Sequence, residues 1–589
     1  MADQLPAYPF EPSRYVGTVV EIGPNRARVN LPQAAKLDGD LHHGDRPGGG
    51  AVGEFLALDA GEVAVLARLT EVRLPERDRL SVEPRTGTSK PVHPIGTVQL
   101  LTSVPLSGTP VERGVTRFPL VGARVYSLDP SLVAWIVERV SDADAEEAAL
   151  LLDLAYLPGT VSAKVRVTPE RLLGRHCAVL GATGSGKSWS LARIIERLSK
   201  FDAKVILLDP TGEYHALTDK VAHVSIGGKD EPSECDDNAF PYTDLEERDL
   251  FALFQPAGKI QGPRLREAIK SLKLARLLGD SDPLVEAGCI PKAGREKKPF
   301  DDAYALHSAS LEEPKANFDI SKLVKQIEYE CVWPSGWGTR TGERDFTKWG
   351  DPHEGDFSMC TTMIARIESD LSSPQFAPLL HPGTSPSLLD TIEGFLANEA
   401  LSVLRISLRH LAFDRNVREM VANGIGRSFL RFAREGRFRE LPLVVCVDEA
   451  HQFLNKELGD EFSRYSLDAF DLIAKEGRKY SLSICLATQR PRDIPDAVIG
   501  QMGTLLVHRL TNDRDREMVG RAAGDLDRAA AEFLPALVPG QALLLGVEFP
   551  IPLTIHVTPP VIPPDSKGPD FQKHWKRKPE SPAAIPTQA

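Results

Sequence analysis

An eight-residue stretch of the chain has the residue types and the spacing that binding of a phosphate chain requires. Residues 181–188 read GATGSGKS, which fits the pattern GxxxxGK[ST], and they stand between an apolar strand at 177–180 and an amphipathic helix. Glycines let backbone N–H groups turn toward phosphate oxygens, and the start of a helix adds a partial positive charge. The pattern therefore predicts a nucleoside triphosphate site formed by Gly181, Thr183, Gly184, Ser185, Gly186, Lys187 and Ser188.

Acidic residues at the end of a second strand complete the requirements for hydrolysis. In the first motif, Lys187 is expected to reach the β- and γ-phosphates, and Ser188 is expected to ligate Mg²⁺. The apolar run 443–447 is followed directly by Asp448 and Glu449. We expect Asp448 to hold the hydrated metal and Glu449 to act as the general base that polarises the attacking water. The two motifs together predict a hydrolytic ATP–Mg²⁺ site.

Two further strand ends carry polar residues. The strand 482–487 runs into Thr488 and Gln489, and we expect Gln489 to contact the γ-phosphate and the water; a simple strand cap is the alternative. The strand in VILLDPTGEY ends at Asp209, with Glu213 four residues later. Both carboxylates should emerge at the carboxyl edge of the sheet, where ligands bind in such folds. Asp209 is expected near the nucleotide, and a turn-capping role for it stays open.

The elements that must position these residues are of two kinds. From residue 15 to about 125, short alternating apolar segments broken by Gly, Pro and Asn are typical of a small β-barrel or sandwich. From about residue 175, apolar strands alternate with helices, which is typical of a parallel α/β sheet. A chain of 589 residues also exceeds one ordinary core. We predict a β-barrel domain with linker at 1–167, an α/β domain at 168–560 and a flexible Pro-rich, basic tail at 561–589.

The α/β pattern is interrupted between residues 216 and 398. Polar, helix-prone segments and Pro/Gly-rich connections replace it there, so we predict a partly helical insertion that serves in packing or oligomerisation. Further predicted elements are helices at 141–152, 362–371, 388–397 and 416–434, and strands at 401–406, 504–508 and 542–547.

Composition limits the remaining possibilities. The chain has 70 Lys and Arg against 82 Asp and Glu, so its net charge of −12 offers no overall attraction to nucleic acid. The seven cysteines form no CxxC pair, which argues against a zinc site or a disulfide framework. The segment HHGD at 42–45 lies in a predicted loop, and a metal site there is the alternative. The start of the chain does not resemble a signal peptide, so we expect a cytoplasmic protein without a membrane segment.

The order of the motifs resembles one family of motor proteins. The segments RHCAVLGATGSGKS, VILLDPTGEY, VVCVDEAH, EGRKYSLSICLATQRP and HRLTNDRDREMV are similar to the HerA branch of the HerA/FtsK motor ATPases, from about residue 174 to 557 outside the insertion. The barrel at the N-terminus also resembles the small barrel of HerA proteins. The resemblance implies a RecA-like P-loop ATPase core.

The same resemblance implies an assembly and partners. Such proteins form a homohexameric ring with ATP sites between subunits and move double-stranded DNA through its centre. An arginine of one subunit completes the neighbouring site; Arg478 is the first candidate, and Arg175 and Arg509 also match basic positions of the family. A separate effector is implied as well: a NurA-like nuclease, another nuclease or a sirtuin-like NADase, in DNA end processing or anti-phage defence.

Competing interpretations remain at this stage. The family often has His where this chain has Thr211. The DEAH sequence at 448–451 resembles DEAH-box helicases, but their QxxGRxGR pattern is absent, and no LSGGQ-like signature of ABC transporters is present. A conjugation-type DNA-pumping ATPase is the nearest competitor. The alternative function is a ring scaffold whose nucleotide state assembles and activates an effector without translocation.

Overall fold

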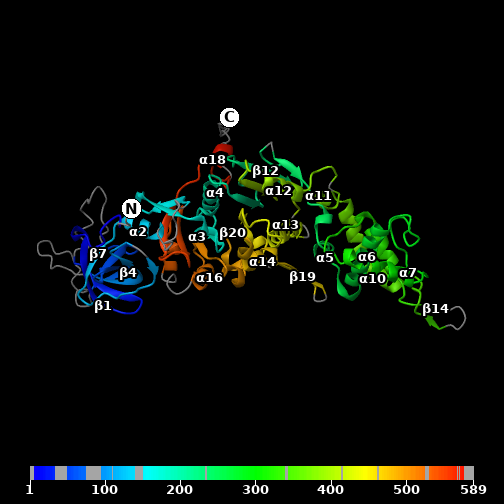
Figure 1. Ribbon diagram of the computed structural model, residues 1–589, viewed down its shortest axis with the longest axis horizontal. Helices are drawn as coiled ribbons and strands as arrows, with labels where there is room; N and C mark the ends of the chain where they lie inside the picture. Colours follow the sequence, from blue (N-terminus) through cyan, green and yellow to red (C-terminus); the bar gives the residue numbers. More distant parts are fainter. Residues whose placement is uncertain are drawn as a thin grey trace, which may run out of the picture.

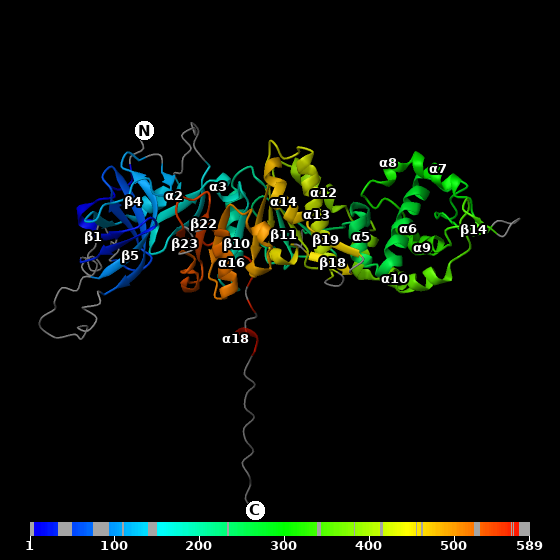
Figure 2. The ribbon, with the colours of Figure 1, turned by 90° about the horizontal axis from the view of Figure 1, so that it is seen from below.

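The protein is an elongated molecule built from three parts in a row. The computed structural model describes residues 5–32, 50–74, 94–108, 111–138, 150–232, 235–337, 343–381, 383–412, 416–454, 456–460, 463–523, 530–566, 568 and 571–575. A β-barrel forms one end of the long axis, a large sheet covered by helices forms the middle, and a group of helices forms the other end (Figures 1 and 2).

The first part is a closed barrel of six strands. Around the barrel the order is β1 (Tyr15–Ile22), β7 (Arg124–Ser127), β3 (Phe55–Asp59), β4 (Val63–Arg73), β5 (Ile95–Pro105) and β2 (Arg26–Asn30), which pairs back to β1. The short strand β6 (Glu112–Arg113) is added to β5. Alternate residues such as Val16, Leu58 and Val65 fill the interior. The predicted barrel is therefore confirmed.

The outer face of the barrel shares a core with the middle part. Ala57 and Leu66 alternate with interior residues, and they belong to one buried cluster with Leu154 and Ile555 of the large sheet. Helix α2 (Pro130–Glu138) contributes Val133 to this cluster. The barrel is thus joined to the sheet by apolar packing as well as by the chain.

The middle part is built on a twelve-stranded sheet in the described part of the chain. From β13 to β21 neighbouring strands are parallel, and from β21 to β9 they are antiparallel. In spatial order the strands are β13 (Asp236–Asn238), β12 (Val221–Ile226), β16 (Val403–Ser407), β11 (Lys204–Asp209), β17 (Leu443–Val447), β20 (Leu482–Thr488), β10 (Cys177–Leu180), β21 (Thr504–His508), β22 (Gln541–Gly546), β23 (Leu553–Val557), β8 (Leu152–Leu157) and β9 (Thr160–Val167).

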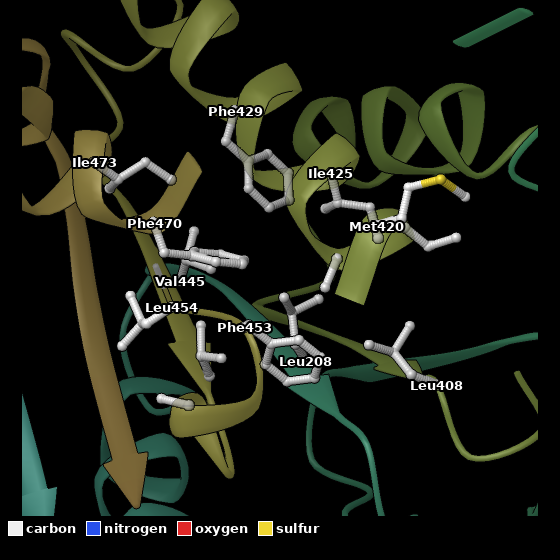
Figure 3. Close-up of a cluster of buried hydrophobic side chains, with 14 of the residues drawn as sticks. Leu208, Leu408, Met420, Ile425, Phe429, Val445, Phe453, Leu454, Phe470 and Ile473 are labelled. Atoms are coloured by element: carbon white, nitrogen blue, oxygen red, sulfur yellow. The ribbon is translucent and has the colours of Figure 1, made fainter. Parts of the chain in front are cut away.

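Helices cover both faces of this sheet. In β10, Cys177 and Val179 pack in the cluster that contains Leu191 of α4 (Lys187–Leu198), whereas Ala178 and Leu180 face the opposite cluster. That opposite face is covered by α13 (Val417–Arg434) and α14 (Ala469–Glu476), as Figure 3 shows. A parallel sheet buried on both faces explains why its strands are continuous apolar runs. The predicted α/β, RecA-like P-loop architecture is confirmed.

The observed sheet changes two predicted boundaries. Strands β8 and β9 extend the large sheet, so its first residue is Leu152 rather than Thr168. Likewise, β12 and β13 belong to the sheet, so residues 221–238 are not part of an insertion that begins at 216. Both pairs lie at sheet edges, where half-exposed strands lack the apolar runs that mark the centre. The predicted helix at 141–152 falls mostly on residues 141–149, which lie outside the described residues, and Leu152 begins a strand.

The third part is helical, as predicted. The predicted helices at 362–371, 388–397 and 416–434 are confirmed as α10, α12 and α13. The remaining helices contain the insertion's own small core around Leu274 and Ile290. The helices are α5 (Glu247–Phe254), α6 (Gly258–Leu278), α7 (Lys298–Leu306), α8 (Ser308–Leu311), α9 (Leu323–Glu330), α10 (Glu354–Ser372), α11 (Ala377–Leu380) and α12 (Leu388–Ala397).

The start of the predicted tail is bound to the sheet domain. The Val561 N–H donates to Glu196 Oε2 at 2.8 Å, and the Asp565 N–H donates to the Glu213 carbonyl at 2.8 Å. These backbone hydrogen bonds fix residues 561–565, which were expected to be flexible. The HHGD segment and residues 576–589 lie outside the described residues. Among the described helices, none combines the length and apolar character needed to cross a membrane.

Candidate active site

The phosphate-binding loop connects β10 to α4, as the first motif predicts. Gly184 and Gly186 have φ values of 74° and 112°, which side chains disfavour. At Gly181 an added Cβ would lie 2.5 Å from Ser185 Oγ and 2.6 Å from His508 Cβ, so only glycine fits. Ser185 supports the loop by donating from Oγ to the Ala182 carbonyl at 2.6 Å. The glycine spacing thus follows from the loop geometry.

Lys187 joins the two acidic residues of the second motif. Its ammonium donates to Asp448 Oδ1 at 2.6 Å and to Glu449 Oε1 at 3.2 Å. All three side chains are buried. Burial acts to lower the pKa of Lys187, but the two carboxylates outweigh it and the pKa is raised. The motifs, 261 residues apart, therefore meet in one charged cluster.

Glu449 is held in an unusual backbone conformation. It follows β17 with a φ of 46°, in the left-handed region that non-glycine residues rarely adopt. Its Oε2 accepts no hydrogen bond among the described residues, although His451 Nδ1 lies 3.4 Å away. Such strain and an unused buried carboxylate oxygen are found together at functional sites. Glu449 lines the cavity and is placed to accept a proton from a water there.

Gln489 lies beside the phosphate-binding loop. The Thr183 hydroxyl donates to its Oε1 at 2.6 Å, and both residues line the same cavity. The neighbouring Thr488 ends β20, and its hydroxyl is 3.0 Å from His451 Nδ1. Gln489 therefore lies beside the phosphate-binding loop and lines the cavity, and its contact with a γ-phosphate stays a prediction.

Asp209 differs from the prediction that it binds the nucleotide. Its Oδ1 accepts the N–H groups of Gly212 at 2.8 Å and Glu213 at 3.2 Å, and its Oδ2 accepts that of Tyr214 at 3.1 Å. Arg405 Nε also donates to Oδ2, at 2.7 Å. The side chain is fully buried and does not line the cavity. Asp209 therefore fixes the loop 210–214, which is the alternative left open above.

That loop places Glu213 and Tyr214 against Ser188. The Ser188 hydroxyl acts to lower the pKa of both side chains, and Tyr214 Oη donates to Asp448 Oδ2 at 3.2 Å. Burial, followed by the charge of Asp448, raises the pKa of Glu213 to about 7. Ser188, Asp448 and Glu213 form a set of hard oxygen donors that suits a magnesium ion. The Oε2 atom of Glu213 is buried and has no hydrogen-bond partner among the described residues, which suits an atom that binds a cation.

A cavity of about 630 Å³ opens beside these residues. The sequence motifs missed several of its lining residues, because they come from the helix after the loop, from the turn after β17 and from the end of the chain. Trp189 had a usable signal, since it directly follows the GKS triplet. The missed residues are Trp189, Gln452, Pro539, Gly540, His556, Thr558 and Ser566.

His508 is a second missed residue that supports the loop. Its Nδ1 faces the Gln541 carbonyl at 2.8 Å, so this nitrogen carries the proton and Nε2 accepts from the Ser190 hydroxyl at 2.8 Å. Burial lowers its pKa to about 4. The ring is therefore neutral and ties the strand β21 to the first turn of α4.

The three predicted arginines lie away from this cavity. Arg175 precedes β10 and Arg478 precedes β20, so both lie at the amino edge of the parallel sheet, opposite the phosphate-binding loop. Arg175 pairs with Glu548 at 2.6 Å, whereas Arg478 is exposed. Arg509 follows β21 near the loop, and its carbonyl accepts the Ala182 N–H at 3.1 Å, but its side chain is exposed. None of the three lines the cavity of its own chain.

Comparison with known proteins agrees with this geometry. Residues 153–322 match the family described as "Helicase HerA, central domain". The chain is 23% identical over 411 residues to "Probable helicase MJ1565" of Methanocaldococcus jannaschii, covering 69% of this chain and 66% of that protein. It is 23% identical over 426 residues to the "DNA double-strand break repair helicase HerA" of Sulfolobus acidocaldarius, covering 71% of each.

A solved structure is similar as well. VirB4 of Thermoanaerobacter pseudethanolicus aligns over 71% of this chain and 97% of that chain, with a TM-score of 0.40 and 15% identity. The phosphate-binding loop and the paired carboxylates after β17 agree with the matches to HerA proteins. Residues 153–322 match the HerA central domain, and 71% of the chain is similar to a HerA helicase.

Proposed function

We propose that the protein is an ATP-dependent double-stranded DNA translocase or helicase that works as a homohexamer. The observation that carries this proposal is the meeting of Lys187, Asp448, Glu449 and Gln489 beside one cavity, together with arginines at the opposite edge of the sheet. The first set provides the chemistry of hydrolysis. The second set is placed where a neighbouring subunit would meet it.

Each residue of the cluster has a distinct role in the proposed reaction. The loop N–H groups and Lys187 bind the phosphates, and Lys187 exchanges its ion pairs with Asp448 and Glu449 for phosphate oxygens. Glu449 is then free to orient the attacking water and take its proton, while Gln489 holds that water against the γ-phosphate. Ser188 and Asp448 would hold Mg²⁺, which when bound neutralises charge on the β- and γ-phosphates.

The arginine positions support a site shared between subunits. Arg478 is exposed, and in the described part of the chain it forms no ion pair. It cannot stabilise the transition state on its own subunit, because a four-residue strand separates the two edges of the sheet. We propose that the ring packs the amino edge of one sheet against the carboxyl edge of the next. Arg478 is therefore the first candidate for an arginine supplied to the neighbouring site, with Arg175 second.

The names of the relatives support the DNA role, whereas the effector role follows only from the family resemblance. Several relatives are named DNA double-strand break repair helicases, which supports duplex DNA as the substrate of this chain too. A separate effector, either a nuclease of the NurA or another type or a sirtuin-like NADase, would supply chemistry that this fold lacks. The barrel is the proposed docking part. The biological role is then DNA end processing or anti-phage defence inside the cytoplasm.

The test compares ATP hydrolysis with and without duplex DNA. We expect DNA to stimulate the steady-state rate several-fold in the wild type, and Lys187→Ala and Glu449→Gln to abolish the stimulated rate. Native mass measurement should give six copies in the presence of nucleotide. Hydrolysis that is indifferent to DNA, with an effector activated by nucleotide alone, would instead establish the ring scaffold; a monomer with ATP bound would refute the shared site.

A further inference from the structure

A second cavity lies between the barrel and the large sheet. Its volume is about 430 Å³, and it is separate from the nucleotide cavity. The barrel contributes Phe55 and Arg68, and the sheet domain contributes Phe533, Gln541 and Thr554. We call this space the junction cavity. Arg68 is the basic residue of the lining, and Glu54 is its acidic residue; Glu54 Oε2 accepts the Gly50 N–H at 2.7 Å, and no ion pair joins Glu54 to Arg68 among the described contacts.

Arg68 is buried, and no counter-ion for it is found among the described residues. Its side chain, on β4, is only 2% exposed, and no carboxylate of the described residues lies within ion-pair distance of it. Its Nη2 donates to Thr554 Oγ1 at 2.9 Å, but Nε and Nη1 have no hydrogen-bond partner. The guanidinium carbon lies 4.1 Å from the centre of the Phe533 ring and 5.7 Å from that of Phe55.

These contacts do not offset the cost of burying the charge. Burial lowers the pKa of Arg68 to about 10, which still leaves the guanidinium charged at neutral pH. Stacking of the guanidinium on the Phe533 ring recovers a small part of the lost hydration free energy. The Thr554 hydroxyl accepts a hydrogen bond from only one of the five N–H groups of Arg68. Buried charges in proteins are normally paired, because an unpaired one is strongly destabilising. A charged Arg68 that lines the cavity and leaves two buried donors without a partner among the described residues therefore indicates a missing anion.

We propose that the junction cavity binds a small molecule that carries a carboxylate or phosphate group on an apolar or aromatic body. The oxyanion would pair with the Arg68 guanidinium, and a small shift of this side chain would let Nε and Nη1 donate to it, because both atoms are buried in the unliganded structure. The rings of Phe55 and Phe533 and the aliphatic residues Leu157 and Leu537 would surround the body of the ligand. The neutral Ser127, Thr160 and Gln541 side chains supply polar contacts for orientation, in addition to Thr554 and the carboxylate of Glu54.

One segment connects this cavity to the nucleotide site. Leu537 and Gln541 line the junction cavity, whereas Pro539 and Gly540 line the nucleotide cavity. The Gly540 N–H donates to the Ser185 carbonyl at 3.1 Å, inside the phosphate-binding loop. A ligand that orders residues 537–541 would thus change nucleotide affinity, and linkage requires that nucleotide change ligand affinity by the same factor.

The test uses the full-length protein and three simple probes. Benzoate and phenyl phosphate carry the two oxyanion groups on an aromatic body, and benzyl alcohol is the neutral control. Binding is followed by ligand-observed NMR with saturating ADP and Mg²⁺, which keeps the probes out of the nucleotide cavity. Arg68→Met removes the charge while keeping an apolar side chain of comparable length. Arg28→Met, which removes an exposed arginine of the same barrel, is the matched control.

Saturable binding of at least one anion is expected, with a dissociation constant on the order of millimolar or lower for so small a probe. Arg68→Met should weaken it at least tenfold, and Arg28→Met should not change it. Preference for the anions over benzyl alcohol in the wild type tests the claim even if Arg68→Met does not fold. Equal binding of benzyl alcohol, or no binding of either anion up to about 10 mM, would overturn the site. If nucleotide affinity does not change when the anion is bound, the anion site is still supported, but the linkage between the two cavities is refuted.

Discussion

The assignment of Asp209 to loop support leads to a prediction that separates it from a metal ligand. In Asp209→Asn, one carboxylate oxygen becomes an NH₂ group. If Oδ1 is replaced, the Gly212 and Glu213 N–H groups lose their acceptor; if Oδ2 is replaced, the Tyr214 N–H and Arg405 Nε do. Either orientation leaves two buried donors facing another donor. At about 1–3 kcal/mol for each, the expected loss of stability is about 2–6 kcal/mol.

The contacts of Arg405 narrow the expected loss of stability in Asp209→Asn. The Arg405 guanidinium is fully buried and also pairs with Asp230 at 3.1 Å. Asp209→Asn therefore removes one ion pair of Arg405 and leaves the other in place. We therefore expect a loss of about 3–4 kcal/mol, near the middle of the range for broken buried polar networks. Denaturant titration followed by circular dichroism measures it, and hydrogen exchange of the peptide covering residues 210–214 locates it.

The control for this prediction is Asp448→Asn, which changes a carboxylate expected to contact magnesium. Asp448→Asn should raise the Mg²⁺ concentration needed for half-maximal hydrolysis at least tenfold. Asp209→Asn should leave that Mg²⁺ requirement within about twofold of the wild type, because its oxygens do not border the cavity. A stability loss below about 1 kcal/mol combined with a tenfold higher Mg²⁺ requirement would refute the structural role of Asp209.

Three further predictions concern the residues around the cavity. Glu449→Gln should lower kcat by about 10²–10⁴-fold while the affinity for fluorescent ATP analogues stays within a few-fold, and near-normal turnover would exclude Glu449 as the base. Arg478→Ala and Lys187→Ala should each be nearly inactive in ATP hydrolysis. Rings assembled from a mixture of the two variants should recover activity, because some of their sites contain an intact Lys187 and an intact Arg478. Absence of recovery on mixing would contradict a shared site. The raised pKa of Glu213 destabilises the nucleotide-free protein above pH 7, and this effect disappears below about pH 4.5, where the carboxyl is protonated in both folded and unfolded chains. Because the side chain is partly exposed, Glu213→Gln should be more stable than the wild type by about 1–2 kcal/mol at pH 8 and equal to it at pH 4.5, and a pH-independent difference would contradict the shift.

The central part of the fold was predictable because its sequence signals are local. The strand at 443–447 is a buried apolar run and the strand at 504–508 is buried with an apolar centre, and the observed bounds of β17 and β21 agree with the prediction. The glycine spacing of the phosphate-binding loop reflects backbone geometry that Gly181 and Gly186 alone permit. Such constraints depend on a few adjacent residues, so the sequence of that segment alone is enough to predict them.

The edges of the sheet and the second layer of the site were not predictable in this way. Strands β8, β9 and β12 are partly exposed. β8 and β12 join the sheet through β23 and β16, which lie far along the chain, and β9 joins it through β8. The roles of His508 and His556 also depend on distant parts of the chain. His508 hydrogen-bonds to Ser190, and His556 of β23 lines the nucleotide cavity. Asp209 shows the limit most clearly, because its residue type fits a ligand and only its hydrogen bonds show a structural role.

The central claim is that hydrolysis at the Lys187–Glu449 site moves the protein along duplex DNA. The most direct test is displacement of a third strand from a DNA triplex placed downstream of a duplex loading region. The wild type should displace it with ATP, and should fail with a non-hydrolysable analogue; Lys187→Ala and Glu449→Gln should fail with ATP. Rapid ATP hydrolysis in the presence of this DNA, without any displacement of the third strand, would contradict the account.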